Sequence, residues 1–181
     1  SGVGFHHRLF YYIRRRTLDR SVHGNSLTKG NKVLVLCDMV IDAQKYAENT
    51  NGTKDNSYEA SLIRAWLNST FIETAFNELQ KEVILTTTVN NSDKAVADYN
   101  STTGNPYLCE DTEDKIFLLS KAEIKNGVVK NGATYAYLTD ADFSTDASRQ
   151  KKATDYAIAQ IGSGYDASNG AWWWLRTPYY D

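Results

Sequence analysis

The hydrophobic and polar positions of the chain form short unbroken apolar runs separated by polar stretches. The run from Val33 to Cys37 predicts a strand that is buried on both faces. The β-branched stretch EVILTTTVNN, residues 82–91, and the stretch DKIFLLS, residues 114–120, predict further strands. Helical patterns lie between these runs, so the sequence predicts a mixture of helices and strands.

Helix-start signals and apolar stripes predict the helices. Asn56 followed by Glu59 precedes a helix over about 58–68, and Thr70 followed by Glu73 begins a second helix. A later helix covers RQKKATDYAIAQIG and ends at Gly162. The residues expected to face the core from the first two helices are Leu62, Ile63, Trp66, Leu67, Phe71, Ala75, Phe76 and Leu79.

Strands and short helices are interleaved without a regular βαβ repeat, so we expect an α+β fold. The polar stretches 90–113, 138–149 and 162–171 are predicted loops, and long polar loops in compact domains are usually functional or disordered. With 181 residues, of which 41% are apolar, the chain is large enough for one domain with a sizeable core.

The stretch AWWWLRTPYY places three tryptophans in succession. In an extended conformation Trp172 and Trp174 face one side and Trp173 faces the other, as in a central strand between two packed layers. Partial exposure of one indole is the alternative. The expected aromatic core consists of Trp66, Phe71, Phe76, Trp173 and Trp174.

Candidate ligand-binding residues come from the same stretch. Arg176 is expected to organise loop carbonyls or acidic loops from a buried position, although its donors also suit stacking on an indole. Tyrosines beyond the predicted strand suit contact with a ligand, because tyrosine is a common contact residue of binding surfaces. The candidates are Trp172, Arg176, Tyr179 and Tyr180.

The first twenty residues carry five arginines and one aspartate, whereas the remainder of the chain is acidic. A basic aromatic segment of this kind can bind nucleic acid or an anionic membrane surface. FHHRLFYYIRRRTLDR is unlike the rest of the chain, however, so a linker, a vector-derived sequence and a docking segment stay open for residues 1–26. We expect the domain over 27–181, no nucleic-acid partner, and no membrane insertion, since no apolar run spans a bilayer.

The stretch DADFSTD, residues 140–146, begins like the calcium loop of a helix-loop-helix motif. Its sixth and twelfth positions hold Thr145 and Lys151, where that motif needs glycine and glutamate. A looser calcium site is therefore the metal candidate, and a solvated acidic loop is the alternative. The candidate ligands are Asp140, Asp142 and Asp146, and no other cofactor is expected.

Catalytic motifs are absent from the sequence. Residues 24–181 contain no histidine, the commonest general base, and no phosphate-binding or dinucleotide-binding glycine motif. Cys37 and Cys109 lack the spacing of metal ligands or a redox pair, and they either stay free thiols or form a disulfide. The acidic cluster 110–114 is expected to face water. We therefore expect no enzyme activity.

Several blocks of the sequence together resemble a family of uncharacterised bacterial domains. In order along the chain, SLIRAWLNSTFIETAF, KIFLLS, TDYA and WWLRTP match the family patterns S-x-I-R-x-W-L-N-x-x-F-x-x-x-A-F, K-I-F-L-L-S, T-D-Y-A and W-W-L-R-S-P-G. The matching positions include Ser61, Ile63, Arg64, Trp66, Leu67, Asn68, Phe71, Ala75, Phe76, Thr154, Asp155, Tyr156, Ala157, Trp173, Trp174, Leu175, Arg176 and Pro178.

This resemblance implies a C-type-lectin-like fold, similar to that of formylglycine-generating enzymes and of the variable proteins of diversity-generating retroelements. Family members are common in exported proteins of gut Firmicutes, which implies an extracellular or cell-surface module for ligand binding or adhesion, with a protein or glycan ligand. The alternatives are an enzyme on the formylglycine-generating-like fold, a variable display protein, and a structural spacer or assembly module.

Two elements that family members usually carry are missing from this sequence: a W-R-V-L strand before NKVLVL and a final V-R-P-A-L strand. The resemblance therefore implies a domain that lacks its C-terminal strand. Three alternatives stay open: the chain is a fragment or a natural truncation, its N-terminal segment fills the gap, or a partner chain does. An unpaired sheet edge favours a homo-oligomer.

Overall fold

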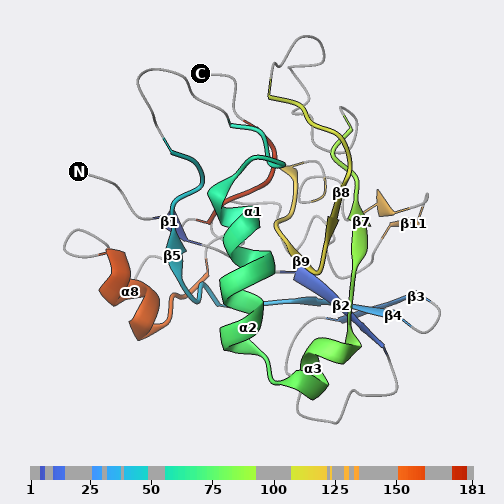
Figure 1. Cartoon of the computed structure of the whole chain (residues 1–181), viewed down its shortest axis with the longest axis horizontal. Helices are drawn as coiled ribbons and strands as arrows, with labels where there is room; N and C mark the ends of the chain where they lie inside the picture. The colour runs from blue at the N-terminus through green and yellow to red at the C-terminus, as the bar shows by residue number, and fades with distance from the viewer. Residues whose placement is uncertain are drawn as a thin grey trace.

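A computed structural model of the chain defines its helices and strands (Figure 1). The structure describes residues 5–6, 10–14, 26–29, 32–37, 39–48, 56–92, 107–121, 123, 129–130, 133–134, 151–161 and 173–178.

The largest sheet is antiparallel and joins strands that lie far apart in the sequence. Its order is β3 (Ser26–Lys29), β4 (Lys32–Leu36), β2 (Phe10–Arg14) and β6 (Ile84–Leu85), and β9 (Ile116–Phe117) also pairs with β2. The apolar run in KVLVLC forms β4, and its residues Leu34, Val35 and Leu36 are buried as predicted. Residues 10–14, from the basic N-terminal segment, lie inside this sheet.

Smaller antiparallel pairs flank the main sheet. β1 (Phe5–His6) pairs with β5 (Ala43–Gln44), β7 (Thr87–Val89) with β8 (Thr112–Asp114), and β10 (Val129–Lys130) with β11 (Ala133–Thr134). The predicted loop 90–113 therefore ends earlier than expected, because its last residues belong to β8. The mixture of helices with a small antiparallel sheet agrees with an α+β fold.

One helical column stands in front of the sheet in Figure 1 and consists of α1 (Leu62–Trp66), the π-helical turn η2 (Leu67–Phe71) and α2 (Ile72–Ala75). Two predictions about this column are wrong. The helix begins at the cap Ser61 rather than at Asn56, and no new helix begins at Thr70, because η2 carries the chain directly into α2.

The next helix is α3 (Glu78–Val83), and its cap is Asn77. The side chain of Asn77 accepts from the Gln80 N–H, and the Gln80 side chain accepts from the Asn77 N–H, which makes a reciprocal capping box. Leu79, which was predicted to face the core, lies on this short helix and is 75% exposed. Leu62 is also exposed in part, because only one stripe of α1 faces the sheet.

Helix α8 (Asp155–Ile161) begins later than the predicted helix over RQKKATDYAIAQIG. Thr154 precedes it, and its hydroxyl accepts from the Ala157 N–H at 3.1 Å. Just before the helix, Val40 and Ala153 form a parallel bridge, with Val40 N–H donating to the Lys152 carbonyl and Thr154 N–H to the Val40 carbonyl. These contacts hold α8 beside β5 (Figure 1).

The main hydrophobic core lies between the helical column and the sheet. It contains Leu34 and Leu36 from β4, Ile63, Leu67 and Phe71 from the column, and Ile116 to Leu119. Trp66, Phe76, Trp173, Trp174 and Leu175 are partly buried against this cluster. The rings of Tyr46 and Trp174 contact each other at a tilt with centroids 5.1 Å apart, and those of Trp66 and Phe71 do so at 5.0 Å.

The tryptophan run differs from the predicted central strand. Residues 173–175 reach the core, but they are not part of a strand. Trp172 lies outside the described residues. Among the described residues, no helix is long and apolar enough to cross a membrane.

Candidate functional site

Arg176 follows the tryptophans, and its side chain is only 1% exposed. Its Nη1 and Nη2 atoms donate to the two carboxylate oxygens of Glu123 at 2.5 and 2.6 Å. Nη1 also donates to the Leu118 carbonyl oxygen at 2.8 Å, and Nη2 to the Asn90 carbonyl oxygen at 3.1 Å. Nε donates to Asn91 Oδ1 at 3.2 Å. Each N–H of the guanidinium fork therefore has an acceptor.

The charge of Arg176 is fixed by its surroundings. Burial alone would lower the pKa of Arg176, but the charge and hydrogen bonds of the Glu123 carboxylate outweigh burial and raise this pKa. The guanidinium therefore stays protonated. A buried pair of this kind mainly fixes geometry, because removing either partner leaves an uncompensated buried charge.

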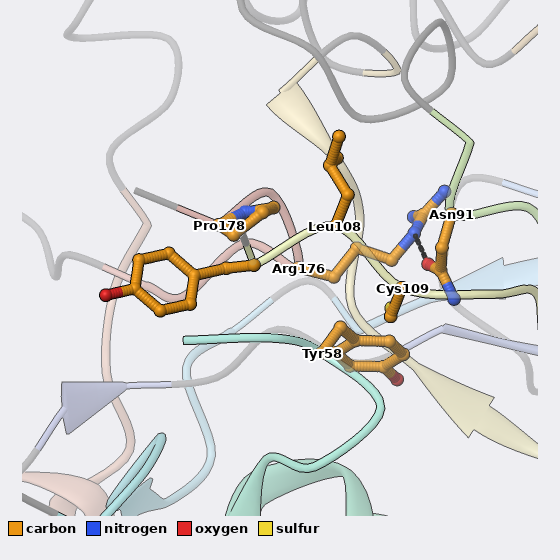
Figure 2. A pocket seen from close by; sticks show the side chains of 7 residues that line it. Tyr58, Asn91, Leu108, Cys109, Arg176 and Pro178 are labelled. Atoms are coloured by element: carbon orange, nitrogen blue, oxygen red, sulfur yellow. Dashed lines mark hydrogen bonds between the residues drawn. The ribbon is translucent and has the colours of Figure 1, made fainter. Parts of the chain in front are cut away.

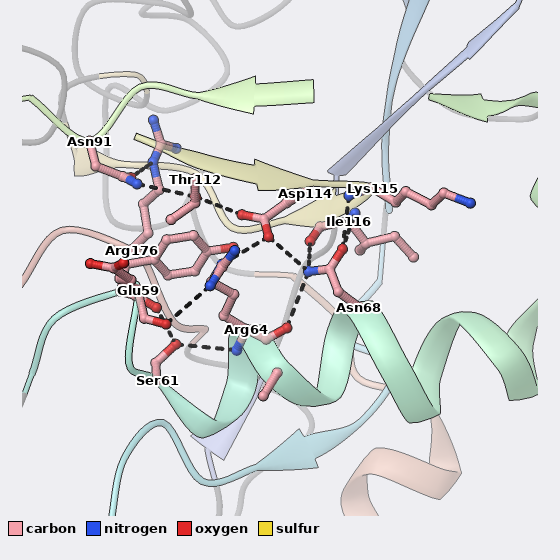
Figure 3. Close-up of polar contacts among 12 residues, drawn as sticks. Glu59, Ser61, Arg64, Asn68, Asn91, Thr112, Asp114, Lys115, Ile116 and Arg176 are labelled. Atoms are coloured by element: carbon pink, nitrogen blue, oxygen red, sulfur yellow. Dashed lines mark hydrogen bonds and ion pairs between the residues drawn. The ribbon is translucent and has the colours of Figure 1, made fainter. Parts of the chain in front are cut away.

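Asn91 connects Arg176 to the β7/β8 pair (Figure 3). Its Nδ2 donates to the Glu110 carbonyl oxygen at 3.0 Å and to Thr112 Oγ1 at 3.2 Å, and its backbone N–H donates to Asp111 Oδ1 at 3.0 Å. The residues after β7 are thereby tied to the residues that lead into β8.

Asp114 is the last residue of β8 and is 1% exposed. Its Oδ2 accepts from the Thr112 hydroxyl at 2.7 Å, and its Oδ1 accepts from Arg64 Nε at 2.8 Å and from Asn68 Nδ2 at 3.3 Å. Burial raises the pKa of Asp114, although the Thr112 hydroxyl and the Arg64 charge oppose the rise. The prediction that cluster 110–114 faces water is wrong for Asp114, because strand alternation turns it inward.

The start of α1 positions Arg64. Ser61 Oγ accepts from the Arg64 N–H at 3.2 Å and donates to the Tyr58 carbonyl oxygen at 2.8 Å, so it caps the helix and fixes the turn before it. Arg64 then reaches Asp114, and its Nη1 donates to the Glu59 carbonyl oxygen at 3.1 Å. Tyr58 is buried beside these groups, and its pKa is raised well above the usual value by burial and by the Asp114 charge.

Asn68 lies on η2 and holds the strand β9 from the side. Its Oδ1 accepts from the N–H groups of Lys115 and Ile116 at 2.8 and 3.2 Å. Its Nδ2 donates to the Ile116 carbonyl oxygen at 2.9 Å and to the Arg64 carbonyl oxygen at 3.1 Å. The amide thus takes the place of a neighbouring strand, since it satisfies both backbone groups of the completely buried Ile116.

The same principle continues along residues 115–121, which we call the clamped segment. The Ser120 N–H donates to Glu123 Oε2 at 2.7 Å, and the Lys121 N–H donates to Thr177 Oγ1 at 2.7 Å. The Arg176 N–H donates to the Leu119 carbonyl oxygen at 2.9 Å. Only residues 116–117 of the predicted strand 114–120 form β9, because most backbone partners of the clamped segment are side chains rather than strands.

A shallow depression lies over the Arg176 end of the network (Figure 2). Its empty volume is about 160 Å³, which includes space open to solvent, and it leaves no room for an enclosed water molecule. Tyr58, Asn91, Tyr107, Leu108, Cys109, Arg176 and Pro178 line it. Burial raises the pKa of the Cys109 thiol, so this cysteine is protonated at neutral pH and is a weak nucleophile.

The chemistry available at this site is limited. The described carboxylates and guanidinium groups of the network are held in ion pairs and hydrogen bonds, and no described group of three or more His, Cys, Asp or Glu side chains could hold a metal ion. Cys37 and Cys109 are free thiols, so the structure contains no disulfide between them.

The predicted site residues are only partly described. Arg176 takes the buried position beside loop carbonyls that the sequence predicts. Trp172, Tyr179 and Tyr180 lie outside the described residues, as do Asp140, Asp142 and Asp146 of the calcium candidate and the loops 138–149 and 162–171.

Sequence reasoning missed the residues that complete the network: Asn91, Thr112, Asp114, Glu123 and Thr177. Only Thr177 could have been found from the sequence. The family pattern has serine at this position, and serine and threonine both carry a hydroxyl that can accept from the Lys121 N–H. The other residues stand in polar stretches without a distinguishing pattern.

The fold is a mixed helix and strand domain. Four polar residues of the family patterns quoted above, Ser61, Arg64, Asn68 and Arg176, belong to its hydrogen-bond network. A family model described as a domain of unknown function (DUF6273) matches residues 30–181, so the chain belongs to this family. No curated protein and no solved structure matches the chain.

Proposed function

We propose that the chain is a non-catalytic recognition module, C-type-lectin-like in its fold, that belongs to an exported bacterial protein and binds a protein or glycan ligand at the cell surface. The loops 90–113, 138–149 and 162–171, together with Tyr179 and Tyr180, form its binding surface. This proposal rests on the ion pairs inside the domain, Arg176 with Glu123 and Arg64 with Asp114.

The observation that supports recognition over catalysis is the pairing of these charges. Arg176 and Glu123 neutralise each other, and Arg64 neutralises Asp114. A general acid or base needs a pKa near the working pH and access to a substrate. Groups that are paired and hydrogen-bonded inside the domain lack free access to a substrate, and they serve to fix the backbone around them.

The parts of the backbone that are fixed are the ends of the polar stretches. Asn90, Asn91 and Glu110 stand at the two ends of the stretch 92–109, and Arg176 and Asn91 hold them. Glu123 ties the clamped segment to the same guanidinium. A rigid framework beneath loops is the usual arrangement of a binding domain, because it reduces the entropy lost when the loops contact a ligand.

The test is binding of the full chain to an array of glycans and of extracellular proteins. Wild-type protein is compared with a Tyr179→Ala/Tyr180→Ala variant and with a Tyr156→Ala variant. Tyr156 is a matched control, since it is a 59% exposed tyrosine on α8. We expect a saturable ligand that is lost with Tyr179 and Tyr180 and kept with the control.

Two results would contradict the proposal. A folded wild-type protein that binds nothing on either array leaves a spacer or assembly role as the better explanation. A ligand that is chemically converted during the assay would place the chain among enzymes on the related fold instead.

A further inference from the structure

The central strand of the main sheet comes from outside the family domain. The family match begins at residue 30, whereas β2 consists of residues 10–14. β2 lies between β4 on one edge and the strands β6 and β9 on the other. A segment that precedes the family domain therefore completes the sheet of that domain.

One edge of β2 is paired along all five residues, and the other edge along residues 10–13. On one edge the register runs from Phe10 opposite Leu36 to Arg14 opposite Lys32. On the other edge β9 pairs with residues 10–11 and β6 with residues 12–13, so two short strands share this edge end to end. A position such as Tyr12 is paired on both sides, with Leu34 and with Leu85.

The strands that border β2 are buried on both faces of the sheet. Leu34, Leu36, Ile116 and Phe117 belong to the main core cluster, while Val35 and Ile84 form a second cluster with Phe76 and Val83 packed against it. Without β2, the backbone N–H and C=O groups that face it from β4, β6 and β9 would be unpaired in an apolar environment. Unpaired buried backbone groups are strongly unfavourable, so this gap requires a strand.

We propose that the gap between β4 and the β6/β9 edge is a strand-acceptor site, which binds an extended peptide with aliphatic and aromatic residues at successive positions. Residues 10–14, with the sequence FYYIR, are its occupant in this chain. Main-chain hydrogen bonds to both neighbouring strands supply the affinity, as in other cases of strand addition. This site is separate from the loop surface proposed above.

A second pairing holds the same segment. β1, residues 5–6, pairs with β5, so Phe5 lies opposite Gln44 and His6 opposite Ala43. The occupant therefore extends over residues 5–14, FHHRLFYYIR. Eleven residues, 15–25, connect it to β3 and can span roughly 36 Å, more than the roughly 15 Å that two strand spacings and a short shift along the sheet require. A cut in this connection leaves the paired segment uninterrupted.

The experiment uses the full chain with a protease site inserted between Gly24 and Asn25. The folded protein is cut there and mixed with a fluorescent peptide of residues 5–14. The control peptide carries Tyr12→Pro, which removes an N–H at a position paired on both sides. We expect the cut segment to co-elute with the remainder, the peptide to replace it in a saturable manner, and the control peptide to bind at least tenfold more weakly.

The proposal is overturned if the cut segment dissociates while the melting temperature of the remainder is unchanged. It is equally overturned if the proline peptide binds as well as the original. A second variant, the uncut chain with Tyr12→Pro, guards against a cut protein that precipitates. Its melting temperature is expected to fall by roughly 6–12 °C, and an unchanged value also overturns the proposal.

Discussion

Replacing Arg176 by lysine separates the two things that the arginine supplies, its charge and its fork of donors. Arg176 donates to Glu123 with both nitrogens of the fork and also to Leu118, Asn90 and Asn91. Lysine keeps the positive charge beside Glu123 but carries only three N–H groups on one nitrogen. Loop carbonyls that Arg176 satisfies therefore lose their donor.

The size of the effect follows from the contacts that lysine cannot replace. At least two of the five contacts are lost, and each buried acceptor left without a donor costs about 1–3 kcal/mol. We expect Arg176→Lys to lower the free energy of unfolding by at least about 2 kcal/mol. Arg176→Met removes the charge as well and leaves Glu123 uncompensated, so we expect a loss of about 3–5 kcal/mol.

The assay is urea unfolding at neutral pH, followed by tryptophan fluorescence and by circular dichroism. Lys81→Met is the matched control, because Lys81 is also a cation in ion pairs, but its two carboxylate partners, Glu73 and Glu78, are 63% and 86% exposed. Exposed ion pairs contribute little, so this control is expected to unfold like the wild type. If Arg176→Lys unfolds with the control, the buried fork does not hold the loop ends, and the reasoning is refuted.

Other residues of the network and of the predicted sites give further predictions. Asn68→Ala leaves the backbone groups of Ile116 without partners, and we expect urea unfolding to show a loss of about 2–3 kcal/mol, whereas a loss below about 0.5 kcal/mol would contradict its strand-like role. Because burial raises the pKa of Asp114 above its unfolded value, the native state binds the proton more tightly, and wild type is expected to lose stability relative to Asp114→Asn as the pH rises from about 4 towards 7. A relative gain over that range would mean that Arg64 outweighs burial. For the calcium candidate, the melting temperature is expected to rise with calcium and fall with chelator, and Asp142→Asn is expected to abolish this response; an unchanged melting temperature in chelator removes the site.

The parts of the fold that depend on local sequence could be predicted. The buried strand β4 and the helical column follow from apolar runs and stripes whose period is set within a few residues. The continuation of the helix through Thr70 could not be predicted, since a Thr and a Glu three positions apart resemble a cap even where η2 continues the helix. Trp173 and Trp174 reach the core as expected, but strand formation also needs a partner strand, which the pattern does not supply.

The network could not be predicted because its members are distant in sequence. Arg64 and Asp114 are separated by 50 positions, and Arg176 and Asn91 by 85. Buried polar residues have the same composition as exposed loops, so Asp114 and Asn91 look like loop residues in the sequence. The apolar run in residues 114–120 predicted a full strand, and the side chains that replace a neighbouring strand there leave no periodic signal in the sequence.

Hydrogen exchange at individual amides tests most directly whether side chains of the buried network hold the clamped segment. The account predicts that the N–H groups of Ile116, Ser120 and Lys121, which donate to Asn68, Glu123 and Thr177, exchange as slowly as those of β4. It also predicts that Thr177→Val accelerates exchange at Lys121 more than at Ile116. Exchange at all three amides as fast as in an open loop would contradict the central claim.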